Sequence, residues 1–179
     1  MSLRLSFIVP FYNVEPYIEE CIRSLYAQDI PWEEYEVICV DDCSPDSSRA
    51  IVERLQSEYP TLKLLTTPEN LRQGGARNMG LDVAQGKYIW FVDSDDYVEP
   101  NVLGKLIEQI ERDNLDVLRF RYQNVRESGE AFAPYKDMTN YNDYSATPTD
   151  GLTFLNERMG NQCYAWQFIL RAELCQEEF

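Results

Sequence analysis

The sequence predicts an α/β fold in which a mostly parallel sheet carries helices on both faces. Short apolar runs alternate along the chain with segments whose apolar residues recur at helical spacing. The apolar runs are continuous, as in strands buried on both sides, and do not alternate with polar residues. Acidic and glycine-rich clusters follow these runs, so they are expected at the carboxyl edge of the sheet, where open α/β sheets bind ligands.

Five apolar runs are expected to form the strands of this sheet. The first is expected to stop at Pro10, and the second to end at the pair Asp41 and Asp42. The runs span residues 5–9, 36–40, 62–66, 88–92 and 115–122.

Four helices are expected between and after these strands. The second should begin with Ser44 as its N-cap and Pro45 as its first residue, and Pro100 should open the fourth. Gly86 should lie just past the end of the third. Their apolar stripes fall within residues 14–26, 45–59, 72–84 and 100–110.

After about residue 123 the periodic pattern weakens. Residues 124–149 are rich in Tyr, Asn, Asp, Ser and Pro, and a loop of that length is usually functional or mobile. A short helix over 152–159 and a short strand over 165–170 are expected beyond it. The chain stops at Phe179 without a closing cap, which suggests a fragment of a longer protein.

The composition excludes several classes of protein. Asp and Glu number 31 against 16 Lys and Arg, a formal net charge of -15, which disfavours general binding to nucleic acid or anionic membranes. A solvated acidic surface accounts for most of this excess. There is no histidine and no Cys-x-x-Cys pair among the five cysteines, so a Cys/His zinc site is excluded. A reduced compartment fits these cysteines, and no apolar run reaches the ~20 residues of a membrane span.

Three carboxylates follow the strand at 88–92 within four residues. Asp93, Asp95 and Asp96 would repel one another unless a cation or strong hydrogen-bond donors offset their charge. Carboxylate oxygens suit Mg²⁺ or Mn²⁺, which often take part of their shell from substrate phosphates. The alternative is a charged loop before a helix. The sequence therefore predicts a metal-assisted site for a phosphorylated ligand.

Two other clusters have both a ligand-binding and a structural interpretation. Asp41 and Asp42 could accept hydrogen bonds from a base or ribose, or could cap the next helix, and both interpretations stay open. Asp46 is expected to be helix N-terminal charge. The glycine pair of 74–75 with Arg77 could cradle a pyrophosphate, or could form a tight turn with a surface arginine. Aromatic neighbours could stack on a base, or could pack in the core or at the rim. These are Tyr12, Trp90 and Tyr97.

Together these clusters resemble glycosyltransferase family 2, the inverting enzymes of the GT-A (Rossmann-like) fold. Four segments carry the resemblance, in the family's order and spacing. They are Ser-Phe-Ile-Val-Pro-Phe-Tyr-Asn at 6–13, Val-Asp-Asp-Cys-Ser-Pro-Asp at 40–46, Gly-Ala-Arg-Asn-Met-Gly at 75–80 and Phe-Val-Asp-Ser-Asp-Asp at 91–96.

The resemblance implies a nucleotide site at the strand ends. Tyr12 would stack on the base, Asp42 would accept from its imide N–H, and Asp41 would support the loop or reach the ribose. The family's usual glycine is Cys43 here, so this turn is expected to adopt a different backbone angle. The nucleotide-binding residues implied by the resemblance are Pro10, Tyr12, Asp41, Asp42, Arg77, Asn78 and Asp93.

The resemblance also implies the metal site. Asp93 and Asp95 would form an Asp-x-Asp motif for Mn²⁺ or Mg²⁺, with Asp95 the closest ligand, and Asp96 would face the acceptor. The catalytic base is expected beyond Phe179, because Glu177 and Glu178 lie too early to match the family's acid. Residues 1–122 would then be the nucleotide-sugar-binding core, and residues 123–179 the truncated start of an acceptor-side region.

The function that the resemblance implies is transfer of a sugar from a nucleotide sugar, with UDP favoured, to a hydroxyl acceptor with inversion. The partners would be the donor and a saccharide or lipid-linked acceptor in cell-surface polysaccharide synthesis. No nucleic-acid partner is expected, and a homo-oligomer stays open. The expected location is the cytoplasm or the periphery of the inner membrane face.

Three other functions remain to be weighed. A sugar-nucleotide-binding module without catalysis fits a chain that lacks the base. A receiver-like phospho-aspartate domain would use Asp41, Asp42 and Asp93, but it needs a late lysine and none follows Lys136. A nucleotidyltransferase would need an early glycine-rich basic loop, and residues 10–15 contain neither glycine nor lysine.

Overall fold

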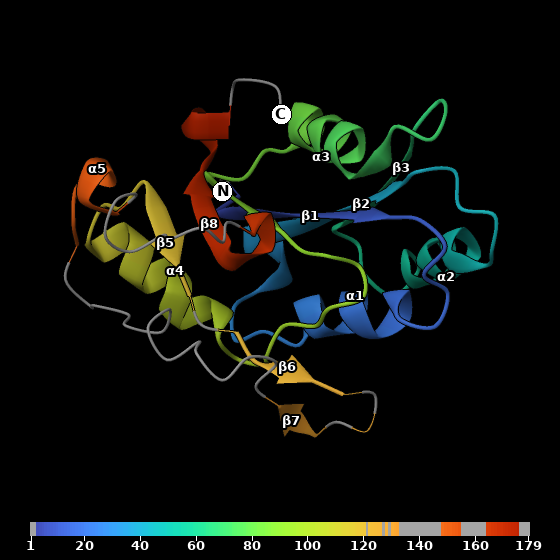
Figure 1. Ribbon diagram of the computed structural model, residues 1–179, viewed down its shortest axis with the longest axis horizontal. Coiled ribbons are helices and arrows are strands. Elements are labelled where there is room, and N and C mark those ends of the chain that lie inside the picture. Colours follow the sequence, from blue (N-terminus) through green and yellow to red (C-terminus); the bar gives the residue numbers. More distant parts are fainter. Residues whose placement is uncertain are drawn as a thin grey trace.

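The computed structural model describes residues 3–120, 122–126, 128, 130–132, 148–154 and 164–175. Within them, a six-stranded sheet has the strand order β3-β2-β1-β4-β8-β5, and a separate two-stranded hairpin joins β6 and β7 (Figure 1). The strands are β1 Leu5–Phe11, β2 Tyr35–Asp41, β3 Leu62–Thr66, β4 Tyr88–Phe91, β5 Val117–Arg119, β6 Asn124–Val125, β7 Ala131–Phe132 and β8 Phe168–Arg171.

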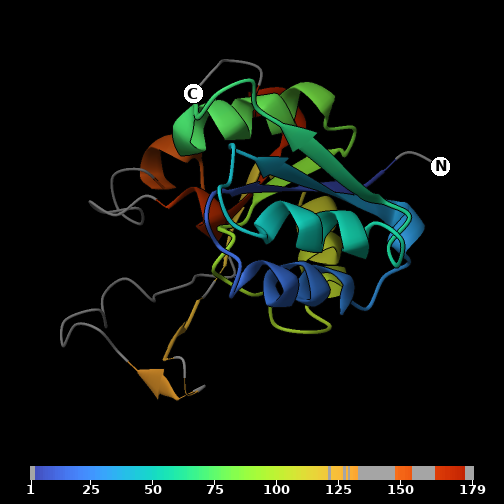
Figure 2. The ribbon, with the colours of Figure 1, turned by 90° about the vertical axis from the view of Figure 1, so that its right-hand side faces the viewer.

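Helices cover both faces of the six-stranded sheet. Helix α3 lies on one face, and α1, α2 and α4 lie on the other (Figures 1 and 2). Strands β1 to β4 pair in parallel, whereas β8 is antiparallel to both of its neighbours, so the predicted α/β class with a mostly parallel sheet is confirmed. The helices are α1 Ile18–Tyr26, α2 Ser48–Leu55, α3 Arg72–Val83, α4 Leu103–Arg112 and α5 Gly151–Thr153, with 3₁₀ turns at Trp32–Glu34, Ala165–Gln167 and Ala172–Cys175.

The core is divided by the sheet into two apolar clusters. The larger cluster joins the sheet to α1, α2 and α4, and the smaller joins it to α3. Cys21 and Cys39 are fully buried free thiols of the larger cluster, and burial raises the pKa of each thiol. No helix among the described residues is both long and apolar enough to cross a membrane.

Pro10 lies inside β1 and does not stop it, so that expectation was wrong. Ile8 O accepts from Val92 N on the β4 side of the strand, and Phe11 O accepts from Asp42 N on the β2 side. Because successive residues of a strand face opposite sides, the nitrogen of Pro10 faces the β4 side. The β1–β4 pairing ends at Ile8 with Phe91, where the next bond would need the N–H that Pro10 lacks, whereas the β1–β2 pairing continues to Phe11.

Helix α4 begins at Leu103 and not at Pro100, and the first two helices also begin later than expected. Helix α1 begins at Ile18, and α2 begins at Ser48 with Ser47 as its N-cap, so the assignment of Ser44 as the N-cap was wrong. The residues before both helices instead form two loops that bond to each other. The cause is long-range, because the side chains of Ser44 and Ser48 accept from amides of the other loop, 31 and 34 residues away.

The weakly patterned end of the chain differs most from expectation. Strand β5 has three residues, fewer than the expected 115–122. Strand β8 inserts between β4 and β5, so these two strands follow each other in the chain but are not neighbours in the sheet. The expected strand over 165–170 begins at Phe168, after a 3₁₀ turn. The β6–β7 hairpin falls within the expected long loop. Most of the helix expected over 152–159 lies outside the described residues, as does 133–147.

Candidate functional site

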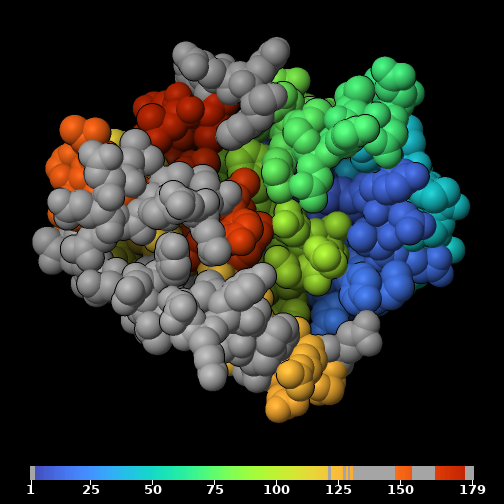
Figure 3. Space-filling model, in the orientation of Figure 1, coloured from blue at the N-terminus to red at the C-terminus, as the bar shows by residue number. Residues whose placement is uncertain are grey.

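The strand-end clusters meet at one edge of the sheet. Strand β1 pairs in parallel with β2 on one side and with β4 on the other, so their carboxyl ends point the same way. Figure 3 shows the blue residues after β1, the green residues around α3 and the yellow-green residues after β4 adjoining on one face. This edge therefore gathers Tyr12, Asp42 and the carboxylates that follow β4.

Asp42 is held at this edge by two donors. Its carboxylate is 3% exposed, and Oδ1 accepts from Thr67 Oγ1 at 2.8 Å and from the amide of Leu71 at 2.8 Å. Leu71 is the N-cap of α3, so the carboxylate also lies at the positive end of that helix. No described residue hydrogen-bonds Oδ2. The side chain is thus oriented with one oxygen left for a donor such as a base imide N–H.

Asp41 has a structural role in this structure. Its buried carboxylate accepts from Ser44 N at 2.8 Å through Oδ1, and Oδ2 lies 3.6 Å from Arg49 Nη1. The side chain therefore stabilises the turn after β2. This arrangement corresponds to the loop-supporting alternative that the sequence left open.

The loops after β1 and β2 are joined by a set of hydrogen bonds that we call the loop clasp, formed by residues 13–15 and 44–48. Glu15 N donates to Asp46 Oδ2 at 2.9 Å, and Ser47 N donates to Glu15 Oε2 at 3.1 Å. Asn13 N and Val14 N donate to the hydroxyls of Ser44 and Ser48. Sequence reasoning missed Glu15, because its partner is 32 residues away and no local pattern marks the pair.

Cys43 lies in the turn beside this clasp. Its φ is 64°, in the left-handed region that favours glycine, although this position carries a cysteine. The exposed thiol lies 3.4 Å from the carbonyl of Thr67, the residue that also binds Asp42. Tyr12 on the neighbouring loop is 49% exposed, with a ring accessible for stacking, whereas Pro10 is buried within β1.

Helix α3 connects the two halves of the site. Its N-cap amide binds Asp42, and its Arg77 donates through Nη2 to Asp93 Oδ1 at 2.9 Å. Arg77 also lies over the ring of Phe91, and its buried Nε has no hydrogen-bond partner among the described residues. A Cβ at Gly74, in the first turn, would meet no atom within 4 Å. The space beside Gly74 at the start of α3 is thus open, and Arg77 further along the helix is held by Asp93.

The carboxylates after β4 differ in their surroundings. Burial raises the pKa of Asp93 even though the Arg77 guanidinium favours its charged form. Desolvation raises the pKa of Asp96 to about 6, with smaller contributions from Asp95 and Asp93. Asp96 is exposed by surface area but lines a cavity, where the surrounding protein removes part of its hydration. Negative charge at this loop is therefore only partly compensated by the protein.

A divalent ion fits these residues only with help from a ligand. Among the residues the structure describes, no three Asp, Glu, Cys or His side chains gather into a group suited to a metal. Asp93 is shared with Arg77, and Asp95 is exposed. Two carboxylates suit Mg²⁺ or Mn²⁺ when phosphate oxygens and water complete the shell.

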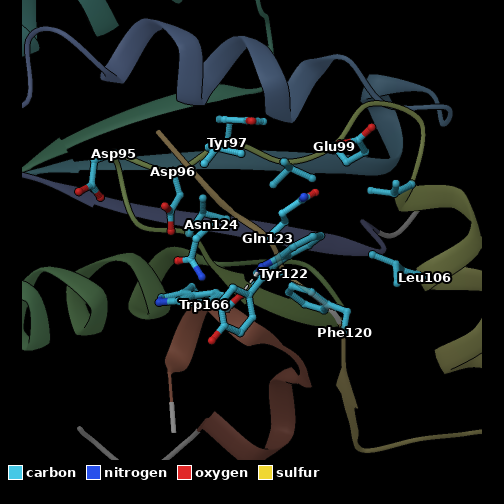
Figure 4. Close-up of a pocket in the computed structure, with 15 residues that line it drawn as sticks. Asp95, Asp96, Tyr97, Glu99, Leu106, Phe120, Tyr122, Gln123, Asn124 and Trp166 are labelled. Carbon is cyan, nitrogen blue, oxygen red and sulfur yellow. Dashed lines mark hydrogen bonds between the residues drawn. The ribbon is translucent and has the colours of Figure 1, made fainter. Parts of the chain in front are cut away.

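A cavity of ≈ 690 Å³ opens beside these carboxylates. Figure 4 shows Asp95 and Asp96 at one end and Leu106 at the other, with Phe120, Tyr122 and Trp166 along one wall. The sequence did not predict this cavity, because its walls come from β4, α4, the segment after β5 and the 3₁₀ turn before β8. Asn78 is half-buried on α3, and Asn124 of β6 lines the cavity.

Comparisons with known proteins agree with this geometry. The chain is 37% identical over 138 residues, 75% of this chain and 24% of the relative, to the poly(ribitol-phosphate) beta-N-acetylglucosaminyltransferase TarS of Staphylococcus aureus. It is 34% identical over 170 residues, 95% of this chain and 48% of the relative, to the uncharacterized glycosyltransferase EpsJ of Bacillus subtilis.

Solved structures of glycosyltransferases resemble the chain as well. TarS residues 1–349 in complex with UDP match with a TM-score of 0.81 and 33% identity, covering 97% of this chain and 48% of that one. A mannosyltransferase from Pyrobaculum calidifontis, in complex with GDP-Man and Mn²⁺, matches with a TM-score of 0.56 and 30% identity, covering 62% of this chain and 32% of that one.

The chain thus spans half or less of the length of these relatives. The family model described as glycosyl transferase family 2 matches residues 6–169, which include every strand of the six-stranded sheet except the ends of β1 and β8. The protein belongs to glycosyltransferase family 2.

Proposed function

We propose that this protein binds a nucleotide sugar, with UDP as the nucleotide, and transfers the sugar to a hydroxyl acceptor with inversion in the synthesis of a cell-surface polysaccharide. The observation that carries the proposal is the position of α3. One helix fixes Asp42 through its N-cap amide and Asp93 through Arg77. The carboxylate proposed for the base and the guanidinium proposed for the diphosphate are therefore held at one edge of the sheet. The UDP complex of the structurally similar TarS supports this ligand.

Each side chain has a role in the proposed donor site. Tyr12 stacks on the base, and the Oδ2 of Asp42 accepts from its imide N–H. Arg77 and the open start of α3 contact the diphosphate, where a guanidinium and free amides suit phosphate oxygens. Asn78 lines the same site. Asp41 positions the loop that carries Asp42, and Pro10 borders the base from below.

Asp95 and Asp93 would hold Mn²⁺ or Mg²⁺, which offsets charge on the departing nucleoside diphosphate. The Mn²⁺ bound to the similar mannosyltransferase supports a metal in this family. Asp96 faces the acceptor side. The base that takes the acceptor proton stays a prediction for a carboxylate beyond Phe179, and Glu177 and Glu178 lie outside the described residues.

The setting belongs to the same proposal. The free cysteines Cys21, Cys39, Cys43 and Cys175 fit a reducing compartment, so we place the protein in the cytoplasm or at the inner face of the membrane. A sugar-nucleotide-binding module without turnover is the second candidate, because no base is assigned within the described residues.

The donor site can be tested by thermal shift with UDP, GDP, dTDP and CDP, each with and without Mn²⁺. We expect UDP with Mn²⁺ to raise the Tm of the wild type and not that of Asp95→Ala. Asp82→Ala, an exposed acid near the end of α3, is the control and should respond like the wild type. Equal shifts in the wild type and Asp95→Ala would remove Asp95 from the site, and hydrolysis or transfer of UDP-sugar would separate an enzyme from a binding module.

A further inference from the structure

A short segment between β3 and α3 holds the carboxylate of Asp42. Thr67 Oγ1 and the amide of Leu71 both donate to its Oδ1, each at 2.8 Å. Asn70 Nδ2 donates to the backbone carbonyl of the same aspartate at 3.2 Å. We call Thr67, Asn70 and Leu71 the Asp42 cradle. Since both bonds to the carboxylate go to Oδ1 and no described residue hydrogen-bonds Oδ2, the cradle favours one rotation of the carboxylate and leaves Oδ2 for a ligand.

Thr67 is the one side chain of the cradle that bonds to the carboxylate itself. It is 3% exposed, so its hydroxyl depends on protein partners. The hydroxyl has one proton and three acceptors nearby, which are Asp42 Oδ1 at 2.8 Å, Asp41 O at 3.3 Å and Cys43 Sγ at 3.7 Å. The carbonyl of Asp41 already accepts from Thr67 N at 3.0 Å, and a charged acceptor at the shortest distance forms the strongest bond. The hydroxyl proton of Thr67 is therefore committed to Asp42.

We propose that Thr67 is a positioning residue for the nucleotide base, and that it gives the site a preference for UDP over CDP. Its donation to Oδ1 of Asp42 keeps Oδ2 available as an acceptor. Uracil presents an N–H donor at N3, whereas cytosine presents a lone pair there, which Oδ2 would repel. A carboxylate free to rotate could turn Oδ2 away from that lone pair and would discriminate less between the two bases. The inference rests on the proposed function and deepens it, because it assigns the choice of base to a residue that acts through Asp42.

The bond between Thr67 and Asp42 also has a purely structural interpretation. A hydroxyl that satisfies a buried carboxylate would stabilise the turn after β2 whatever the ligand, so its loss would weaken UDP and CDP together. A positioning role predicts a different result, because only a nucleotide that donates to Oδ2 benefits from the fixed carboxylate. The ratio of the two affinities therefore separates the two interpretations.

The test is isothermal titration calorimetry of the protein with UDP and Mn²⁺, and CDP is measured by its displacement of UDP. We expect Thr67→Val, which removes the hydroxyl at nearly the same volume, to weaken UDP binding about tenfold and CDP binding by less than about twofold. Thr67→Ser keeps the hydroxyl and should restore UDP binding to within about twofold of the wild type. If the valine variant does not fold, Thr67→Ala and Thr67→Ser form a second pair that differs only in the hydroxyl oxygen.

Thr61→Val is the matched control. Thr61 lies just before β3, at the opposite end of that strand from Thr67, and its hydroxyl is 3.1 Å from Tyr26 Oη. The control therefore makes the same chemical change and also removes one side-chain hydrogen bond. We expect it to leave the preference for UDP unchanged.

Four results would overturn the inference. These are a wild type that binds CDP as tightly as UDP, an equal loss of both nucleotides in Thr67→Val, a failure of CDP to displace UDP from that variant, or a serine variant that does not recover UDP binding. A wild type that binds no UDP would refute the proposed function and this inference together. A preference for UDP that no change at Thr67 alters would refute the inference alone and leave the proposed function intact.

Discussion

At the scale of single residues, the site depends on backbone conformations with positive φ, which residues other than glycine rarely adopt. Asn13 in the loop clasp and Cys43 in the turn beside it have φ values of 55° and 64°. A non-glycine residue in this region costs roughly 1–2 kcal/mol, and a β-branched residue more. The hydrogen bonds of the clasp offset this strain and hold Tyr12 and Asp42 on adjoining loops.

Cys43 allows this strain to be measured. We expect Cys43→Val to lower the free energy of unfolding by about 1–2 kcal/mol, because a branched Cβ crowds a left-handed backbone. Cys43→Gly relieves that crowding and should be neutral or stabilising. Urea denaturation of the three proteins provides the comparison. A valine variant as stable as the wild type would show that the turn changes conformation freely.

Asp96 makes stability depend on pH. Its pKa is about 6 in the folded protein against an ordinary value of 3.8, so the folded state holds the proton over a wider range. The stability of the metal-free protein should therefore fall as the pH rises through this window. Asp96→Asn removes the charge and should raise Tm at about pH 7.5, with little effect at about pH 4. An equal gain at both values, or a similar gain in Asp82→Asn, would contradict this origin.

At the scale of elements, α3 positions both halves of the site because it lies unusually close to the sheet. A Cβ at Gly80 would lie 2.5 Å from Ile8 Cγ2 of β1 and 3.4 Å from Val40 Cγ2 of β2. Both neighbours are stiff branched side chains in the core, so they have little room to move. The glycine therefore sets the distance between α3 and the strands whose ends carry the ligand groups.

Two glycines of α3 should respond in opposite directions. Gly80→Ala should destabilise the protein by about 1–3 kcal/mol through overpacking, and by moving α3 it should weaken UDP binding. Gly74→Ala meets open space and should raise the free energy of unfolding by up to about 1 kcal/mol, yet weaken UDP binding by blocking the approach to the helix start. Denaturation and UDP titration measure the two effects. Unchanged UDP affinity in Gly74→Ala would remove the start of α3 from the ligand site.

At the scale of the whole molecule, β8 ties the end of the described chain to its centre. It pairs with β4 through Ile169 opposite Trp90, and with β5 through Ile169 opposite Leu118. The same segment places Trp166 in the cavity wall. The strands whose ends carry the residues of the proposed nucleotide-sugar site and the strand that places Trp166 in the cavity wall are thus parts of one sheet.

We expect Ile169→Ala to lower the free energy of unfolding by about 2–5 kcal/mol, because the side chain is fully buried between neighbouring strands. Val117→Ala on β5, 37% exposed, should cost less than about 1 kcal/mol. Denaturant unfolding followed by circular dichroism and by tryptophan emission should give one coincident transition. Two separate transitions would show that the β8 segment docks independently of the parallel core.

The sequence by itself determined the parallel core and the chemistry of its edge. The strand over 62–66 and the third helix could be predicted almost to the residue, because continuous apolar runs and helical spacing are local signals. The acids after the second and fourth strands were recognisable for the same reason. The resemblance to a known family supplied the roles proposed for Asp42, Asp93 and Asp95.

Only the tertiary structure decided how these groups are held and what lies beside them. The pairing of Glu15 with Asp46, the contact of Arg77 with Asp93 and the insertion of β8 join residues far apart in the chain. Short strands such as β5 and β8 have too few residues for a periodic signal, and their neighbours are selected by burial in the assembled sheet. The cavity exists because that sheet brings Trp90, Phe120 and Trp166 together, and no local stretch of sequence contains it.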